Sequence, residues 1–413
     1  MQTEKHHPIN QNINPHWRRQ ITLFLTSQTV SLLGSAIVAY AIIWYVTLTT
    51  ASGLMMTIST LFTFLPQIFV SLFAGVWADR YHRKYLILLA DVLIAVSTLI
   101  LAILFLIGYQ ELWLLFLVSG IRSFGAGVQT PAVNSLIPQL VPEDKLMKVN
   151  GINGSIQSLT FIIAPAISGG LLVAFSLEYT FFIDVVTAML AVGILAVIPI
   201  PLHPKARKKN TTTALADLKE GLRYIQQQRF IRVLFIYYAL IMFFITPAAF
   251  LTPLLITRIY GSEVWLLTVN EIFFSGGTMI GGLIIALWGG YTNRIKTISV
   301  GCFVFGLAIS AMGVAPNFVL YILFIFISGL AIPFLSAPTT VLLQEIVAVD
   351  IQGRVFSILQ LIATTALPLG MVIFGPLADF IPIQTLLIVS GLIMAGCSLT
   401  IIRNKALTTV NGK

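Results

Sequence analysis

Length, composition and charge narrow the class of protein. The chain has 413 residues, of which 57% are hydrophobic and only 9% are charged, whereas a soluble domain averages about 25% charged residues. Its long apolar runs predict an all-α membrane protein, since a membrane β-barrel would instead show alternating segments of ~10 residues. The net charge of +9 would suit a nucleic-acid partner, but the placement of the basic residues argues against one.

The chain begins with a polar arm, residues 1–17, that contains three histidines. A disordered tail is expected there; a metal site is the alternative, but no carboxylate or cysteine cluster accompanies the histidines. The apolar run after Arg19 is too long for the hydrophobic region of a cleavable signal peptide. Both cysteines, Cys302 and Cys397, lie in apolar runs, so no disulfide framework is expected.

Twelve long apolar segments predict twelve transmembrane helices in two bundles of six. Each is long enough to cross a hydrocarbon core of about 30 Å at a rise of 1.5 Å per residue. The predicted domains are the arm 1–17, an N-terminal bundle 18–200, a cytoplasmic linker 201–230, a C-terminal bundle 231–403 and a cytoplasmic tail 404–413. The predicted spans are 18–46, 52–77, 85–107, 112–132, 151–174, 179–200, 231–257, 264–288, 297–315, 317–341, 354–377 and 382–402.

Basic residues gather on one side of these spans. If both chain ends are cytoplasmic, only Arg258 falls outside and only Arg122 falls inside a span. Cytoplasmic loops are enriched in Lys and Arg, so this asymmetry predicts the orientation and explains the net charge without nucleic acid. A bacterial-type cell membrane is the expected location. The tryptophans fall near predicted span ends, as an aromatic belt requires: Trp17, Trp44, Trp77, Trp113, Trp265 and Trp288.

The linker 201–230 divides the chain into halves that look like repeats. Its first part is basic and Pro-rich, and its second part predicts a short amphipathic helix that tethers the linker to the inner leaflet. Segment 130–146 matches segment 336–353 at half the chain's length, which suggests parallel repeats. The predicted apolar face of the linker helix holds Leu215, Leu218, Leu222 and Ile225; the matched positions include Pro131 with Pro338 and Leu136 with Leu343.

The loop after the second span carries a motif. GVWADRYHRK (75–84) resembles the G-x-L-A-D-R-x-G-R-K loop of the major facilitator superfamily, with Trp77 in place of Leu and His82 in place of Gly. A basic flank placed by the positive-inside rule would explain the Arg and Lys residues but not the Gly and Asp. The resemblance implies a role in conformational gating for Gly75, Asp79, Arg80 and Arg83, with a latch between Asp79 and Arg354 at the start of span 11.

A second motif lies in span 5. IIAPAISGG (162–170) resembles the antiporter motif G-P-x-x-x-G-G, with Ala164 replacing the first Gly. Pro165 removes a helix hydrogen bond, and Gly169 and Gly170 would let another helix approach. In the superfamily this motif marks exporters, although glycine and proline are also common in membrane helices generally.

Ionisable residues inside spans are the candidates for coupling transport to protons. A cation at a helix centre costs about 2.5–3.5 kcal/mol, so Arg122 needs a partner; the resemblance implies proton transfer, and the alternative is a structural Arg that snorkels or pairs with an Asp. Glu271 is the main candidate, because a carboxyl withdrawn from water binds a proton more readily; the alternative is a hydrogen-bonded structural Glu. Asp184 is expected to be mostly structural, Asp91 to pair with a cytoplasmic-side Arg, and Asp379 to be solvated.

Span 1 carries a polar stripe on one helix face. Such neutral groups suit a cavity for an amphiphilic substrate, with Gln28 as a candidate contact, and simple helix packing is the alternative. The stripe consists of Ser27, Gln28, Ser31 and Ser35.

The chain resembles the Mef-type macrolide efflux branch of the major facilitator superfamily over residues 17–403. The resemblance rests on segments 27–37, 75–84, 122–142, 270–277 and 353–358. The chain has no G-x-x-x-x-G-K-[ST] loop for ATP, and no enzyme motif, cofactor or metal site is expected. The resemblance implies a secondary exporter of amphiphilic drugs, coupled to protons by antiport. Export of an endogenous siderophore or lipid, and a non-transporting membrane sensor, are the alternatives; an ATP-binding partner protein stays open.

Overall fold

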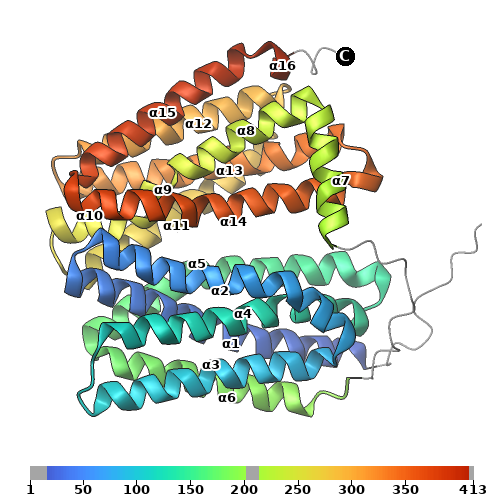
Figure 1. Ribbon diagram of the computed structural model, residues 1–413, viewed down its shortest axis with the longest axis vertical. Coiled ribbons are helices and arrows are strands. Elements are labelled where there is room, and N and C mark those ends of the chain that lie inside the picture. The colour runs from blue at the N-terminus through green and yellow to red at the C-terminus, as the bar shows by residue number, and fades with distance from the viewer. Residues whose placement is uncertain (1–15, 201–213, 409–413) are drawn as a thin grey trace, which may run out of the picture. The chain divides into compact units, whose positions relative to one another are not determined.

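The computed structural model describes residues 16–200 and 214–408 (Figure 1). The predictions for the N-terminal arm, the basic part of the linker and the end of the tail lie outside these ranges. Every regular element within them is a helix. In the first half these are α1 (Trp17–Thr50), α2 (Gly53–Arg80), α3 (Arg83–Leu106), α4 (Leu112–Leu140), the short 3-10 helix η1 (Glu143–Lys145), α5 (Leu146–Ala174) and α6 (Leu177–Val197).

The second half begins with the linker helix and ends in a short helix after the last span. Its elements are α7 (Ala214–Gln227), α8 (Arg229–Phe244), α9 (Thr246–Phe250), α10 (Thr252–Ile259), α11 (Val264–Trp288), α12 (Arg294–Gly313), α13 (Phe318–Ile346), α14 (Val349–Phe380), α15 (Ile383–Arg403) and α16 (Lys405–Thr408).

Twelve segments of the described chain are long and apolar enough to cross a membrane, which confirms the predicted number of spans. Span 7 is not one straight helix: it consists of α8, α9 and α10, with breaks at Ile245 and Leu251. Pro247 and Pro253 follow these breaks, and a proline cannot donate the backbone hydrogen bond that would continue the preceding helix. Several helices, such as α4, extend beyond the predicted span, because hydropathy detects only the part inside the hydrocarbon.

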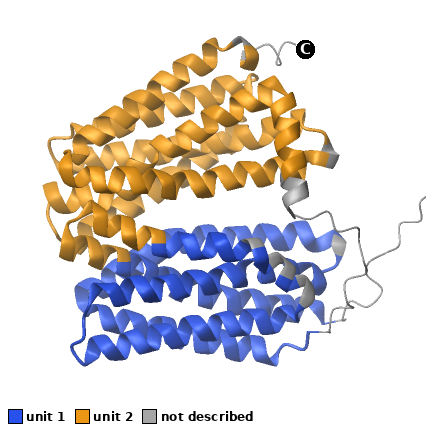
Figure 2. Cartoon of the chain, viewed as in Figure 1, with its two compact units in different colours: residues 1–42, 62–209 blue, residues 43–61, 210–413 orange. Residues whose placement is uncertain are grey.

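The contacts within the chain divide it into two compact units, coloured separately in Figure 2. Unit 1 comprises residues 1–42 and 62–209, and unit 2 comprises residues 43–61 and 210–413. The end of α1 and the start of α2 therefore group with the second half of the chain. The predicted domains instead place residues 43–61 in the N-terminal bundle, 18–200.

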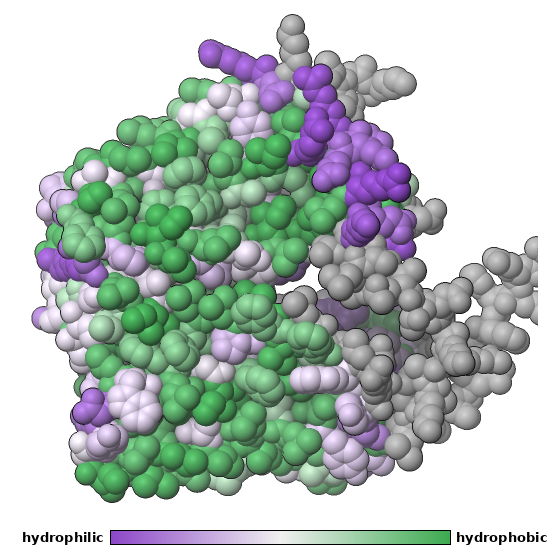
Figure 3. All heavy atoms as spheres, in the orientation of Figure 1, coloured by the Kyte–Doolittle hydropathy of each residue, from purple (hydrophilic) through white to green (hydrophobic). Residues whose placement is uncertain are grey.

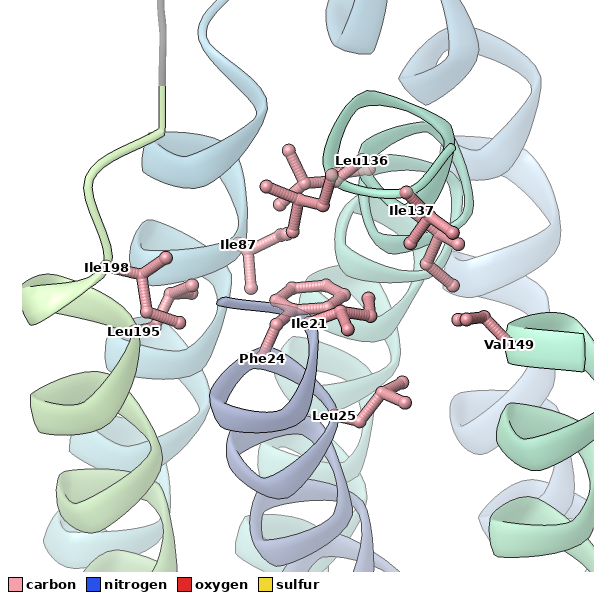
Figure 4. Packing of buried hydrophobic residues seen from close by; sticks show 12 residues of the cluster. Ile21, Phe24, Leu25, Ile87, Leu136, Ile137, Val149, Leu195 and Ile198 are labelled. Carbon is pink, nitrogen blue, oxygen red and sulfur yellow. The ribbon is translucent and has the colours of Figure 1, made fainter. Parts of the chain in front are cut away.

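Unit 1 is held together by apolar side chains from five helices (Figure 4). Phe24 of α1 is fully buried among them, as are Ile87 of α3 and Leu136 of α4. Lipid tails are as apolar as these side chains, so close van der Waals packing rather than water exclusion stabilises the contacts inside a membrane. The cluster also includes Ile21, Leu25, Ala132, Ile137, Leu140, Val141, Val149, Leu195 and Ile198.

Within unit 2, glycines bring helices α11 and α13 into contact. A Cβ at Gly277 or Gly281 of α11 would lie 2.3 Å from a backbone oxygen of α13, Phe326 O and Leu330 O respectively. A Cβ at Gly329 of α13 would lie 2.3 Å from Phe274 O in return. Only glycine permits this separation of backbones, as is usual between membrane helices.

The helix faces turned away from the two cores are apolar, as contact with lipid requires. Figure 3 shows mainly hydrophobic residues over the helices and a group of hydrophilic residues around α7. Trp113, Trp265 and Trp288 are about half exposed, at 52%, 50% and 47%, in keeping with an aromatic belt. Trp44 is a correction to that prediction: it is 1% exposed and lies in the core, because apolar character near a span end does not tell lipid from protein.

The linker helix α7 packs against α14 of the same unit (Figure 1). Its buried face holds Gly221 and Ile225, and a Cβ at Gly221 would lie 2.8 Å from Ile358 Cδ1. Leu222 is 43% exposed, so the predicted apolar face is rotated at that position, while the side chains of Leu215 and Leu218 lie outside the described residues. The helix is thus docked on the protein rather than only tethered.

Candidate functional site

A buried ion pair joins two helices of unit 1. Arg122 of α4 and Asp184 of α6 are 8% and 1% exposed, and their side chains form a salt bridge. Arg122 also donates to Thr98 Oγ1 of α3, and its Nη2 donates to Ser35 O of α1 at 3.2 Å. A buried charge requires such partners. The structure thus contains the Arg–Asp pair that the sequence analysis gave as the alternative to a role in proton transfer.

Asp184 has all of its carboxylate oxygens satisfied. Ser35 Oγ donates to Oδ1 at 3.2 Å, and Thr98 Oγ1 donates to Oδ2, which also receives Arg122. The approach of α1 depends on Gly34, where a Cβ would lie 1.9 Å from Thr187 Oγ1 and 3.2 Å from Asp184 Oδ1. Four helices of unit 1 therefore meet at one charged pair.

Asp91 forms a second buried carboxylate site in unit 1. It is 1% exposed and accepts hydrogen bonds from Ser31 Oγ at 2.7 Å and from Gln129 Nε2 at 2.8 Å. The predicted ion pair with an Arg does not occur among the described residues, where no basic side chain contacts this carboxylate. The two basic residues at the start of its own helix, Arg83 and Lys84, instead donate to backbone carbonyls at helix ends.

The polar stripe of α1 is used mainly in helix packing. Ser27 Oγ donates to Ala191 O at 2.9 Å, and Ser31 and Ser35 donate to the two buried carboxylates. The packing alternative therefore describes the serines better than a cavity does. Gln28 differs: its Nε2 is buried and has no hydrogen-bond partner among the described residues.

Glu271 lies on α11 of unit 2, beside a buried polar pair. Asn270 Nδ2 donates to Glu271 Oε1 at 3.3 Å, and Tyr321 OH donates to Asn270 Oδ1 at 3.0 Å. Asn270 and Tyr321 are 3% and 0% exposed, so the carboxyl approaches an apolar region with neutral neighbours. No salt bridge to Glu271 occurs within residues 214–408. Glu271 therefore differs from Asp184, whose partner is a cation.

A pocket of about 630 Å³ lies within unit 2, between α8, α13 and α14. Its lining contains hydroxyl, amide and aromatic side chains and no charged one. The volume falls in the range of sites that bind a small organic molecule. The lining residues are Tyr238, Ser336, Thr339, Thr340, Gly353, Phe356, Ser357, Leu359 and Gln360. Sequence reasoning missed the pocket, because Tyr238 of α8 is distant in the chain from the lining residues of α13 and α14.

Asp379 is exposed, as the sequence suggested, but its carboxylate is also bound by protein groups. It accepts from the backbone N–H groups of Gly53 and Leu54 at 2.7 and 2.9 Å and pairs with Arg258 at 2.6 Å. The carboxylate thus lies at the N-terminus of α2, where the helix dipole favours negative charge. Hydropathy places Asp379 at a span end but cannot reveal a partner more than 300 residues away.

The predicted gating residues are only partly described. Arg354 forms a salt bridge with Glu220 of α7, 2.7 Å from Nη1 to Oε1. Pro165 and Gly169 are buried in α5, whereas a Cβ at Gly170 would meet no atom within 4 Å, so no described helix approaches it closely in this state. The side chains of Gly75, Asp79 and Arg80 lie outside the described residues.

Comparison with known proteins gives consistent relatives over the whole chain. A family model described as transmembrane secretion effector matches residues 13–411. Macrolide efflux protein A of Streptococcus pyogenes is 32% identical over 378 residues, which cover 91% of this chain and 93% of that protein. Multidrug efflux pump Tap of Mycolicibacterium fortuitum is 25% identical over 373 residues and 88% of this chain, covering 90% of its own length.

Solved structures show the same fold at low identity. A POT family transporter in complex with 5-aminolevulinic acid has a TM-score of 0.72 at 14% identity, covering 96% of this chain and 97% of that one. The nucleoside transporter NupG has a TM-score of 0.69 at 15% identity, covering 94% of this chain and 100% of its own. The likeness confirms the predicted fold class of twelve membrane helices.

Proposed function

The chain belongs to the major facilitator superfamily, in its Mef-type macrolide efflux branch, and from this we propose that it exports amphiphilic drugs, macrolides among them, by proton-coupled antiport. It is a multi-pass membrane transporter and not an enzyme. The observation that carries the proposal is the similarity to macrolide efflux protein A over 91% of the chain. With both chain ends in the cytoplasm, export moves the drug outward from the cytoplasmic side or the inner leaflet.

The pocket of unit 2 supports this choice of substrate. Macrolides are large, oxygen-rich and amphiphilic, and the lining offers neutral hydrogen-bonding groups such as Thr339, Thr340 and Gln360 together with the rings of Tyr238 and Phe356. A pocket without charge needs no counter-charge on its ligand. Substrate binds there first, and Gln28 of unit 1, whose buried amide nitrogen has no partner, is a further candidate contact.

Proton coupling in this proposal depends on ionisable groups inside the spans. Glu271 binds and releases the proton, since its neighbours are neutral and a carboxyl near apolar surroundings exchanges protons more readily around neutral pH than one in water. Arg122 and Asp184 keep a charged pair inside unit 1 that responds when the helices move. A drug leaves as a proton enters, so the proton gradient drives export.

Conformational gating is assigned to the two motifs. The contact between Asp79 and Arg354 closes the cytoplasmic side and breaks when that side opens. Gly75, Arg80 and Arg83 shape the loop of the first motif. In the second motif, Pro165, Gly169 and Gly170 allow α5 to bend. Glu220 of α7 binds the same Arg354, so the linker helix takes part in this switch. If Asp79→Asn left transport and the balance of states unchanged, the latch would be discarded.

An endogenous oxygen-rich amphiphile, such as a siderophore or a lipid, is the alternative substrate. The uncharged lining favours it as much as it favours a macrolide. The two substrates are separated by expressing the protein in cells. If the substrate is endogenous, expression would protect cells that overproduce that compound and would leave the accumulation of every macrolide unchanged.

The proposal is tested by the accumulation of radiolabelled macrolide in cells that express the wild type or Glu271→Gln, with and without a protonophore. We expect low accumulation in the wild type, and high accumulation after either the protonophore or the substitution. Glu111→Gln is a matched control, since Glu111 is exposed at the N-cap of α4 and makes no side-chain cap hydrogen bond. Equal accumulation in every case would refute export of that macrolide.

A further inference from the structure

Asp91 is a buried carboxyl with one oxygen that no described group satisfies. Its Oδ1 accepts both available hydrogen bonds, from Ser31 Oγ at 2.7 Å and from Gln129 Nε2 at 2.8 Å. Its Oδ2 is buried and has no hydrogen-bond partner among the described residues. An ionised carboxylate would leave a negative oxygen without any donor, which is costly in an apolar interior.

Asp184, in the same unit, provides an internal comparison. Both carboxyls are 1% exposed. Asp184 has a guanidinium partner, Arg122, and donors on both oxygens, which is the arrangement that a buried negative charge requires. Asp91 has two neutral donors on one oxygen and none on the other. That pattern matches the neutral acid, in which a carbonyl oxygen accepts hydrogen bonds and the second oxygen carries the proton.

The described groups around Asp91 offer no compensating positive charge. From α1 it faces Ser31 and from α4 it faces Gln129, both neutral. The charged groups nearby on α4 and α6 are Arg122 and Asp184, which neutralise one another. On the side of α2, the neighbouring turn of α3 packs Ala90 against the apolar residues Val70 and Ala74. At the start of α3 itself, the basic side chains of Arg83 and Lys84 reach backbone carbonyls.

We propose that Asp91 is a proton-binding site of the transport cycle, positioned by Ser31 and Gln129 and separate from Glu271. The inference rests on the proposed function, because a proton site matters only if protons are coupled to transport. One proton binds at Oδ2 and forms the acid; its loss leaves a carboxylate, and no other bond changes. The site is closed to solvent in the state described, because Asp91 is 1% exposed. Its proton can therefore exchange with water only in another state of the cycle. This restriction couples proton movement to conformation.

The direct test is the infrared carbonyl absorption of a protonated carboxyl, recorded on the purified protein at neutral pH. We expect a component of this absorption in the wild type that Asp91→Asn removes and Glu271→Gln retains. Ser31→Ala removes one hydrogen bond to the carbonyl oxygen and should shift the band to higher frequency. A spectrum in which Asp91→Asn removes no carbonyl component would overturn the proposal, whatever the variant does in transport.

The second test separates coupling from translocation in proteoliposomes. Counterflow exchanges labelled for unlabelled macrolide without net proton movement, whereas accumulation against a gradient requires protons. A gradient of about one pH unit drives accumulation of about tenfold for each proton coupled. Asp91→Asn, which keeps both hydrogen bonds to Oδ1, should retain counterflow and lose this accumulation, and Asp91→Glu should regain part of it.

The outcomes of the second test distinguish the two proposals. Normal accumulation by Asp91→Asn beside a responsive wild type would overturn the role of Asp91 alone. A wild type that exchanges the macrolide but ignores the pH gradient would overturn proton coupling, and the role of Asp91 with it. If Asp91→Asn does not fold, Ser31→Ala and Asp91→Glu carry the test, since both keep a carboxyl at the site.

Discussion

Arg258 of α10 and Asp379 at the end of α14 form an ion pair, 2.6 Å from Nη2 to Oδ1, around the turn between α1 and α2. Arg258 also donates from Nη2 to Ala51 O at 2.7 Å, and Ala51 is the one described non-glycine residue with a positive φ, at 46°. Asp379 caps the following helix through Gly53 and Leu54. The pair thus fastens residues 43–61 to the second half of the chain and holds a strained turn in place.

The first prediction separates a helix cap from a simple ion pair. Asp379→Asn should lower the stability of the purified protein by about 1 kcal/mol, because the cap of α2 is weakened. The charge reversal Arg258→Asp with Asp379→Arg should not restore the melting temperature in detergent, because an Arg cannot accept from the Gly53 and Leu54 N–H groups. Asp144→Asn, at an exposed ion pair with Lys145, is the control and should have little effect. Full recovery in the charge reversal would show that the cap contributes nothing.

A second prediction concerns the buried pair of unit 1. Arg122→Gln should destabilise the protein by about 3–5 kcal/mol, because it leaves Asp184 ionised, buried and without its cation. The double variant Arg122→Gln with Asp184→Asn should recover most of that loss, since no net charge is then buried. Thermal unfolding of the four proteins gives the coupling energy. Additive losses in the double variant would mean that the two side chains do not stabilise one another.

Two adjacent glycines of α11 give a third prediction with its own control. Gly281→Ala should destabilise the contact with α13 by about 1–3 kcal/mol, because the new Cβ would lie 2.3 Å from Leu330 O and the backbones must separate. Gly282→Ala should be tolerated, because a Cβ there meets no atom within 4 Å. Melting temperatures measured side by side check the difference, and equal effects would argue against close α11–α13 packing.

The pocket of unit 2 leads to a fourth prediction. Gln360→Leu should weaken macrolide binding by about two- to tenfold, the value of one net hydrogen bond, and should raise the susceptibility of expressing cells to the drug. Ser155→Ala is the control, because Ser155 is exposed and its hydroxyl donates only to Gly151 O of its own helix. Unchanged binding for Gln360→Leu, Thr339→Val and Phe356→Ala together would place the substrate elsewhere.

The sequence predicted the spans well, because each span is encoded by its own residues. It also singled out Arg122, Asp184 and Glu271, since an ionisable residue within an apolar run stands out by itself. It did not reveal the partners of two other carboxylates: Asp91 was assigned to an Arg, and the protein groups that bind the exposed Asp379 were not foreseen. Both carboxylates are bound by groups from distant parts of the chain, and no local pattern encodes such pairings.

The contrast between local patterns and contacts across the chain also explains why the linker helix and the pocket differ from the predictions. The linker helix was predicted from its periodicity, but the face it buries was decided by Gly221, whose missing side chain lets α14 approach. The pocket lining was not foreseen either, because Ser and Thr in helices often bond to the backbone of their own helix. Thr340, for example, donates to Ser336 O one turn away, and nothing in the sequence marks the space beside it.

The central claim is that drug movement and proton movement are obligatorily linked. The most direct measurement places purified protein in liposomes that contain a trapped pH indicator and imposes a macrolide gradient at equal pH on both sides. The account predicts that protons move against the direction of the drug, that the internal pH changes, and that Glu271→Gln abolishes this change. Macrolide movement through the wild type with no change in internal pH would contradict it.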